Sequence, residues 1–217
     1  MIEGPNQIIE CPHCGSFIKV FTLQSGNTFG ATFWSDGKME APMLPQPPAL
    51  TRCYACRNFY WVAQANQVGE LHPNITKGKQ YPNIDQAWVD APEVEEPSET
   101  EYWEALQSDV ADEQNEERLR FLAWRRSNNA FRELSPDAAP SRSEAAIQNM
   151  QKLVEMINDE NPGSRLMKAE ILRELGRFDE CINVLDTIDE EKLNSARDQI
   201  LELAQAGSNQ VARLHFD

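Results

Sequence analysis

Long apolar runs are missing from this 217-residue sequence. A membrane-spanning helix needs about 18 or more consecutive apolar residues, and no stretch of the chain approaches that length. The first ten residues, MIEGPNQIIE, also lack the basic start and the apolar core of a secretory signal. We therefore expect a cytoplasmic protein with no membrane partner.

Catalytic motifs are also lacking. The three histidines, His13, His72 and His215, are scattered along the sequence in predicted loop or tail positions. No phosphate-binding loop, paired-carboxylate motif or nucleophile–base arrangement stands out. The sequence therefore predicts a protein that is not an enzyme.

Positive charge is scarce and unevenly placed. The chain has 20 Lys and Arg against 35 Asp and Glu, a formal net charge of −15. Residues 1–82 contain five acids and six basic residues, whereas residues 83–217 contain 30 acids and 14 basic residues. This change predicts a boundary near residue 82. An acidic surface repels phosphate backbones, so the second part favours a protein partner over nucleic acid.

Only five cysteines are present, and a disulfide framework is not expected in a reducing compartment. Four of them form two C-x-x-C pairs, and such a turn presents two sulfurs to one ion because its peptide N–H groups stabilise their charge. The predicted ligands of one structural Zn²⁺ are Cys11, Cys14, Cys53 and Cys56. A shell of four thiolates leaves no position for water or substrate, which is typical of a structural staple.

The first pair, Cys11-Pro12-His13-Cys14, followed by Gly15, resembles a rubredoxin-type zinc knuckle. In the second pair Arg57 stands where that pattern favours glycine. The same tetrapeptide also occurs in the active sites of some thioredoxin-fold oxidants, an alternative that requires a strand before it and a helix after it. Here Gly15, Ser16 and a β-like run follow instead, which favours the metal site. His13 lies inside the turn and is expected to face solvent.

Short β elements are expected around both cysteine pairs. Asp36-Gly37 predicts a tight hairpin turn because glycine tolerates a positive φ. The prolines of residues 41–48 predict an extended surface connection. Residues 1–68 are therefore expected to form a zinc ribbon with a long inserted hairpin and a Pro-rich loop. Its few basic and aromatic residues leave nucleic-acid binding as an alternative, which the near-neutral charge of this part disfavours.

An acidic, proline-containing segment follows at residues 69–112. Between Asp85 and Glu117 there are 13 acids and no Lys or Arg. Such a run is typical of a solvated connector, and the cluster of apolar residues near Glu101 to Ser108 allows one short helix.

Residues 113–217 read as helices throughout, which gives an α+β protein with an all-α second part. The first predicted helix spans Glu113 to Leu134. The next begins with Pro140 and a capping box at Ser141 to Glu144, and it carries apolar residues at helical spacing up to Ile157.

Three arginines recur every seven residues in the first of these helices and so share one face. They are Arg118, Arg125 and Arg132. One interpretation, which we favour, is internal pairing with the acidic run just before them. The other is that they bind a partner, either an acidic peptide or a phosphate.

Residues 162–195 resemble a single tetratricopeptide repeat. In that family's helix–turn–helix, small and large apolar residues, a glycine and an aromatic residue recur in a fixed order. The matching positions are Ala169, Leu172, Gly176, Phe178, Cys181 and Leu185. Arg165 departs from the pattern at the early aromatic position, and Leu193 departs at the closing proline. The resemblance implies that Cys181 is a small buried residue.

A lone repeat cannot bury both its faces, so helices at 143–158 and 190–206 are expected to stack on it. As a whole, the chain resembles a group of uncharacterised bacterial proteins that join an N-terminal CPxCG-type ribbon to tetratricopeptide-like helices. Arrays of that family hold peptides or proteins on a concave face. The resemblance therefore implies a cytoplasmic adaptor that binds a protein partner. Two alternatives stay open: a nucleic-acid-associated regulator that uses the ribbon, and an acidic inhibitor or immunity-type protein that blocks a basic site.

Overall fold

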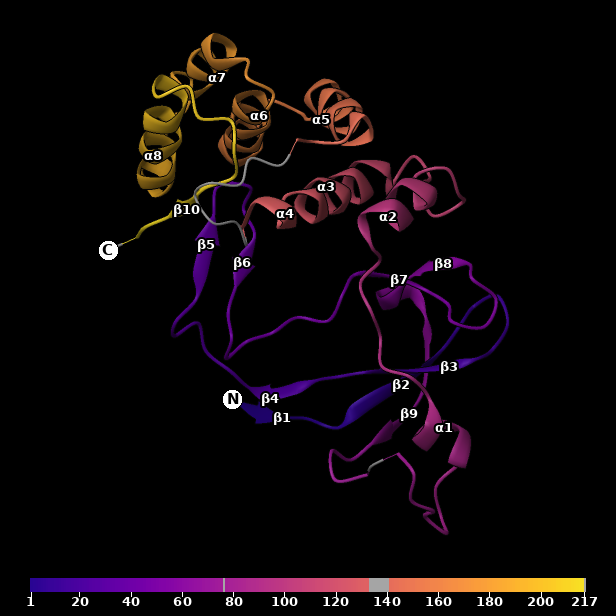
Figure 1. Ribbon diagram of the computed structural model, residues 1–217. Coiled ribbons are helices and arrows are strands. Elements are labelled where there is room, and N and C mark those ends of the chain that lie inside the picture. The colour runs from indigo at the N-terminus through magenta and orange to yellow at the C-terminus, as the bar shows by residue number, and fades with distance from the viewer. Residues whose placement is uncertain (76, 133–140, 217) are drawn as a thin grey trace. The chain divides into compact units, whose positions relative to one another are not determined.

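The computed structural model describes residues 1–75, 77–132 and 141–216, and it confirms a mixed α+β protein (Figure 1). The chain divides into two compact units. Unit 1 comprises Met1–Ala31, Ala41–Glu101 and Ser108–Val110. Unit 2 comprises Thr32–Glu40, Tyr102–Gln107 and Ala111–Asp217. Among the described residues, no helix is both long enough and apolar enough to span a bilayer.

Unit 1 is built from short antiparallel strands in three separate sheets. These strands are β1 (Ile2–Glu3), β2 (Asn6–Glu10), β3 (Phe17–Val20), β4 (Leu23–Ser25), β7 (Leu50–Arg52), β8 (Phe59–Trp61) and β9 (Asn66–Leu71). Strand β2 lies between β3 and β9, while β7 pairs with β8 and β1 pairs with β4. A 3-10 turn, η1 (Val62–Gln64), and a short helix, α1 (Gln86–Asp90), complete the unit.

One buried cluster of unit 1 lies between the β2–β3 hairpin and the β7–β8 hairpin. Its buried members are Ile9, Cys11, Ile18, Val20, Cys53 and Tyr60. Two of these six residues are cysteines of the two C-x-x-C pairs, so the sulfurs adjoin this cluster. Further buried apolar residues of the unit include Ile8, Leu50 and Val89.

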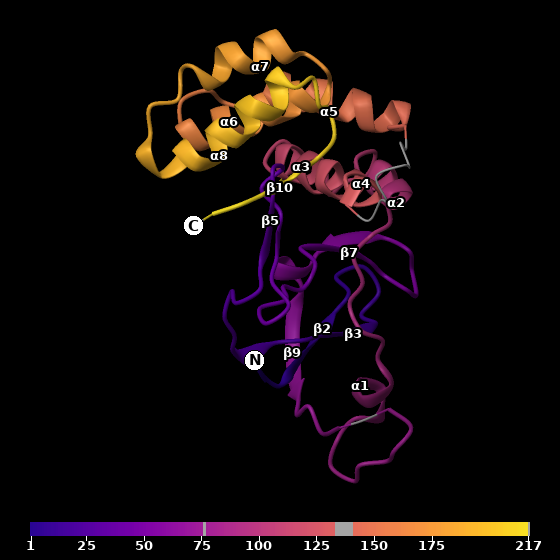
Figure 2. The ribbon, with the colours of Figure 1, turned by 60° about the vertical axis from the view of Figure 1, so that its left-hand side comes forward.

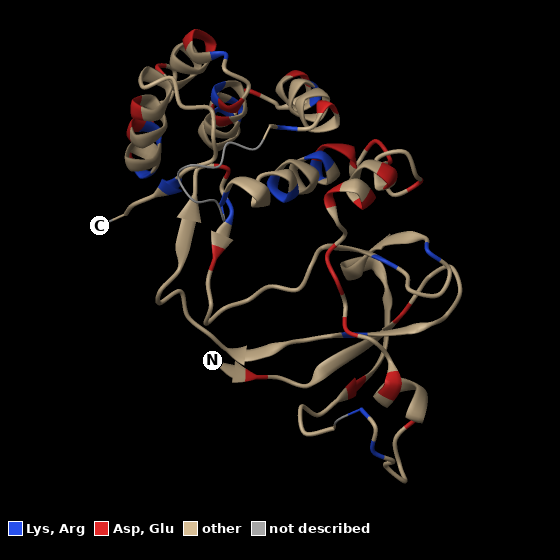
Figure 3. Cartoon of the chain, in the orientation of Figure 1, with Lys and Arg blue, Asp and Glu red and all other residues tan. Residues whose placement is uncertain are grey.

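Most of the acidic segment predicted as a connector belongs to unit 1, where its backbone forms hydrogen bonds. The Val94 N–H donates to the Lys19 carbonyl at 2.7 Å, and the Lys19 N–H donates to the Pro92 carbonyl at 2.8 Å. The Thr51 hydroxyl donates to the Glu95 carbonyl at 2.9 Å. Most of the acidic side chains are exposed, and Figure 3 colours these residues red along the chain before α2. The acidic run therefore combines exposed side chains with a hydrogen-bonded backbone.

Unit 2 contains the hairpin that the sequence predicts as an insertion in the zinc ribbon at residues 1–68. Strands β5 (Thr32–Trp34) and β6 (Met39–Glu40) form it, and β10 (Arg213–Leu214) pairs with β5. The predicted turn is present, and Gly37 has φ of +73°. Directly after β10, the Gln199 side chain accepts from the His215 N–H at 2.9 Å and donates to the His215 carbonyl at 2.8 Å.

The rest of unit 2 is helical, as Figure 2 shows for α5 to α8. The helices are α2 (Glu99–Ala105), which begins in unit 1, α3 (Glu116–Ser127), α4 (Asn129–Arg132), α5 (Glu144–Met156), α6 (Pro162–Glu174), α7 (Phe178–Leu185) and α8 (Asn194–Gln205), with a 3-10 turn η2 (Glu191–Leu193). The predicted helix from Glu113 is shorter and breaks at Asn128. Its predicted end at Leu134, like Pro140, lies outside the described residues.

The helix boundaries follow from local chemistry. The Ser143 hydroxyl caps α5 by accepting from the Ala146 N–H, so the cap is two residues later than the predicted Ser141. Asn161 caps α6, with Pro162 in the first turn. Gly176, with φ of +75°, ends α6 and allows the sharp turn into α7.

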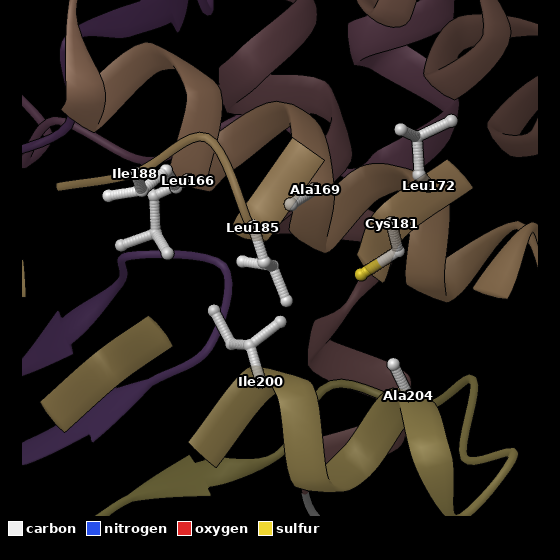
Figure 4. Close-up of a cluster of buried hydrophobic side chains, with 8 residues drawn as sticks. All are labelled: Leu166, Ala169, Leu172, Cys181, Leu185, Ile188, Ile200 and Ala204. Carbon is white, nitrogen blue, oxygen red and sulfur yellow. The ribbon is translucent and has the colours of Figure 1, made fainter. Parts of the chain in front are cut away.

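Unit 2 has two apolar clusters, one among α3, α5 and α6 that includes Trp124, Met150 and Leu153, and one that α6, α7 and α8 enclose, drawn in Figure 4. The latter cluster consists of Leu166, Ala169, Leu172, Cys181, Leu185, Ile188, Ile200 and Ala204. Cys181 is buried among them, as the resemblance implied, and burial raises the pKa of its thiol to about 12. This cysteine therefore packs as a small apolar residue.

A charged cluster lies beside Trp124, whose indole N–H donates to Glu174 Oε2 at 2.8 Å. Arg132 and Asp36 form an ion pair whose side chains are only 3% and 0% exposed. The Asn128 amide donates to Asp36 Oδ2 at 3.0 Å and to Glu174 Oε1 at 3.1 Å. Arg142 Nη2 lies 2.8 Å from Glu174 Oε2. These bonds fasten the β5–β6 turn to α3, α4 and α6.

We predict that Asp36→Ala lowers the free energy of unfolding of unit 2 by about 3–5 kcal/mol, because Arg132 then remains buried without its counter-ion. Urea denaturation followed by helical circular dichroism measures this loss. The matched control is Glu155→Ala, which breaks an exposed pair with Lys152 and should cost less than about 1 kcal/mol. Equal effects of the two substitutions would contradict the prediction.

Candidate metal centre

The structure brings together all four cysteines of the two C-x-x-C pairs. Cys11 and Cys14 lie in the turn between β2 and β3, and Cys53 and Cys56 lie in the turn between β7 and β8. Their four Sγ atoms all lie within 4.8 Å of one another. Two hairpins whose turns are far apart in the sequence therefore present four sulfurs to one point.

The sulfur separations suit a shared ion. Cys11 Sγ lies 3.8 Å from Cys56 Sγ, and Cys14 Sγ lies 3.7 Å from Cys53 Sγ. A tetrahedral ion with metal–sulfur bonds of about 2.3 Å sets its sulfurs about 3.8 Å apart. A disulfide would need about 2.05 Å, and all four cysteines are free. The set can hold one tetrahedral metal ion.

The two turns have the same backbone hydrogen bonds. In the first, the Gly15 N–H donates to the Cys11 carbonyl and the Cys11 N–H to the Ser16 carbonyl, both at 2.9 Å. In the second, the Arg57 N–H donates to the Cys53 carbonyl at 3.0 Å and the Cys53 N–H to the Asn58 carbonyl at 2.9 Å. Each turn therefore points its two sulfurs the same way.

Both turns need a left-handed residue just after the second cysteine. Gly15 has φ of +72°, and Arg57 has φ of +64°. Arginine pays a steric cost there that glycine does not. The surrounding contacts hold it in place: Arg57 Nη2 lies 3.1 Å from Glu101 Oε1, and Arg52 Nε donates to the Arg57 carbonyl at 2.8 Å.

Two side chains in the first turn support the sulfurs. The Ser16 hydroxyl oxygen lies 3.2 Å from Cys14 Sγ and 3.1 Å from Cys53 Sγ. His13 Nε2 lies 3.2 Å from the Phe59 carbonyl, to which it can donate. The His13 side chain is exposed, as expected, and it bridges the two hairpins.

The thiols differ in acidity when no metal is bound. Burial raises the pKa of Cys11 to about 12. Burial also raises the pKa of Cys53, but hydrogen bonds from the Cys56 N–H and the Ser16 hydroxyl outweigh it and lower the pKa to about 6. The Ser16 hydroxyl lowers the pKa of Cys14 as well. A metal ion must therefore displace the Cys11 proton at neutral pH, so binding weakens as the pH falls.

The centre has a buried side and an open side. Cys11 and Cys53 are 2% and 1% exposed and belong to the core of unit 1. Cys14 is exposed, and Cys56 is half-buried. The open side gives a metal ion a way in.

The three arginines predicted as a possible partner-binding face do not act as one set. Arg125 Nε donates to the Asp36 carbonyl at 3.1 Å, and Arg132 pairs with the Asp36 carboxylate. Arg118 is exposed. Internal pairing of Arg125 and Arg132 was the favoured interpretation, but their partner is the β5–β6 turn and not the acidic run.

Two residues that form key contacts in the structure are not indicated by the sequence. Ser16 carries no motif beyond its place two residues after Cys14. Asp36 belongs to an Asp-Gly turn, which ordinarily faces solvent. Neither position has a sequence signal that distinguishes its role.

Comparison of the chain with protein-family models, curated protein sequences and solved structures gives no significant match.

We predict that Arg57→Gly gives a more stable unit 1 than Arg57→Ala, by about 1 kcal/mol, because both lose the Glu101 contact but only glycine relieves the positive φ. Conversely, Gly15→Ala should destabilise unit 1 by about 1–2 kcal/mol. A Cβ at Gly15 meets nothing within 4 Å, so the cost lies in the backbone alone. Urea denaturation followed by the NMR signals of unit 1 measures these differences. Equal stabilities of the two Arg57 variants would contradict the prediction.

Proposed function

We propose that Cys11, Cys14, Cys53 and Cys56 hold one structural Zn²⁺ and that the protein is a non-catalytic, cytoplasmic adaptor. The observation that carries the metal assignment is the set of sulfur separations, which fit one tetrahedral ion. Four thiolates fill such a shell, so no position remains for water or substrate. Free thiols in these numbers suit a reducing compartment.

Zinc is the proposed ion because it is bound by four thiolates without any redox role. Iron accepts the same ligand set and geometry, so the two metals have to be told apart by measurement. When bound, the ion supplies a link between the two hairpins and no chemistry of its own.

The adaptor role rests on unit 2. Helices α6 and α7 form a helical hairpin that turns at Gly176 and buries Ala169 and Cys181 at its crossing. These positions match those of a tetratricopeptide repeat, and α5 and α8 pack beside the hairpin. Stacked helical hairpins of that kind present continuous surfaces on which proteins and peptides bind.

A protein partner is favoured over nucleic acid by the charges of unit 1. Arg52 and Arg57 both lie beside the Glu101 carboxylate, at 3.3 and 3.1 Å. Their charge is therefore partly offset within the chain. Nucleic-acid binding depends on uncompensated positive charge, which this carboxylate reduces.

We expect the purified protein to contain one zinc per chain, and its removal by a chelator to unfold unit 1 while the helical signal of unit 2 persists. The cluster between the two hairpins includes two of the four cysteines, so the hairpins are expected to depend on the binding energy of the ion to stay together. Elemental analysis, circular dichroism and NMR dispersion before and after chelation measure this.

Cys53→Ser should abolish zinc binding, whereas Cys181→Ala, which removes the thiol outside the site, should leave it intact. Visible absorption from bound iron in freshly purified protein would contradict the zinc assignment. Unchanged NMR dispersion of unit 1 after metal removal would contradict the structural role.

The adaptor role is tested by affinity purification of the tagged intact chain from its native host, followed by mass spectrometry. We expect a stoichiometric protein complex that persists in high salt and is recovered after nuclease treatment. Recovery of nucleic acid alone, with a salt-sensitive gel shift, would contradict the adaptor role and favour a regulator. A stable complex with a toxin whose active site is basic would instead favour an inhibitor.

A further inference from the structure

The Ser16 side chain lies over one edge of the sulfur cluster. Its hydroxyl oxygen is 3.2 Å from Cys14 Sγ and 3.1 Å from Cys53 Sγ, and these two sulfurs are 3.7 Å apart. They come from different hairpins. A single hydroxyl thus contacts both turns of the site at once.

The backbone hydrogen bonds of the turn do not involve this hydroxyl. Ser16 contributes its carbonyl to the turn by accepting from the Cys11 N–H, and Asn58 does the same for Cys53 in the second turn. The backbone of Ser16 also donates to Cys14, as the backbone of Asn58 does to Cys56. The two positions are therefore equivalent in the backbone and differ in the side chain, which at Ser16 contacts two sulfurs.

When a metal ion is bound, the negative charge on the sulfurs favours a hydrogen bond from the hydroxyl. Four thiolates around a divalent cation leave a net charge of −2, which is spread over the sulfurs. Thiolate sulfur accepts hydrogen bonds, and each such bond withdraws electron density from it. Cys53 also accepts from the Cys56 N–H at 3.4 Å, whereas Cys14 is the exposed member of the set.

We propose that Ser16 is a positioning residue of the metal centre, donating its O–H across Cys14 and Cys53 so that it strengthens metal binding and makes the exposed Cys14 less reactive toward electrophiles. This inference rests on the proposed zinc site. The class of reagent concerned is a soft alkylating electrophile.

With iodoacetamide, a Cys14 electron pair attacks the methylene carbon, an S–C bond forms, the C–I bond breaks and iodide leaves. The resulting thioether is a poor zinc ligand, so the ion dissociates. The rate of zinc release therefore reports how nucleophilic the bound sulfur is.

The test compares Ser16→Thr with Ser16→Val, which have the same shape but differ in the hydroxyl. On the zinc-loaded intact chain we expect Ser16→Thr to behave as the parent. We expect Ser16→Val to bind zinc about tenfold more weakly and to release it several-fold faster to iodoacetamide, as a chromophoric chelator reports. In the Co²⁺-loaded proteins, the sulfur-to-cobalt charge-transfer band of Ser16→Val should move to lower energy. Asn58→Ala, at the equivalent position of the second turn, should leave band and rate unchanged.

Identical affinity, release rate and charge-transfer energy in Ser16→Thr and Ser16→Val would overturn the inference, because only the hydroxyl separates them. Equal changes in Asn58→Ala and Ser16→Val would also overturn it, since they would trace the effect to the turn. A parent protein that takes up neither zinc nor cobalt would instead refute the proposed metal site itself. Should Ser16→Val fail to load any metal while Ser16→Thr loads fully, the hydroxyl is required for binding and the inference stands.

Discussion

Unit 1 depends on the meeting of two hairpins that no backbone ladder joins. Strands β2 and β3 belong to one sheet and β7 and β8 to another, and about forty residues of chain separate their turns. Between the turns lie the four sulfurs, the Ser16 hydroxyl and the His13 side chain. A metal ion at this point would link the hairpins directly, as a disulfide would in an oxidising compartment, but with four ligands in place of two.

Unit 2 is held together by apolar packing and by buried ion pairs. Its helices bury two apolar clusters, and beside Trp124 of one of them the carboxylates of Asp36 and Glu174 face Arg132 and Arg142. Burial raises the pKa of Glu174, and the neighbouring Arg142 opposes that shift. Such pairs add little net stability but penalise any arrangement that separates them. They therefore fix where the β5–β6 hairpin attaches.

The features that the sequence predicted well are those with local causes. The two C-x-x-C pairs identified the four cysteines that lie together, because few residue types bind a soft cation, and Asn161, Pro162 and Gly176 specify the ends of α6 within one turn. The attachment of the hairpin to unit 2 was not predictable in this way. It arises from an ion pair between Asp36 and Arg132, which are 96 positions apart, and an Asp-Gly turn gives no sign of burial. The charge pattern of the acidic segment describes its side chains, whereas the hydrogen bonds of its backbone with β3 have no signal in the sequence.

The Gln199 side chain has a consequence for how the protein behaves at high concentration. An edge strand of a sheet exposes unpaired peptide groups, with which a strand of a neighbouring molecule can pair. In unit 2 a carboxamide from α8 satisfies the His215 N–H and carbonyl, in the manner of one peptide unit of a further strand. The backbone directly after β10 is therefore closed from within, and it offers other molecules no free pair of groups at His215 for strand exchange or fibre growth.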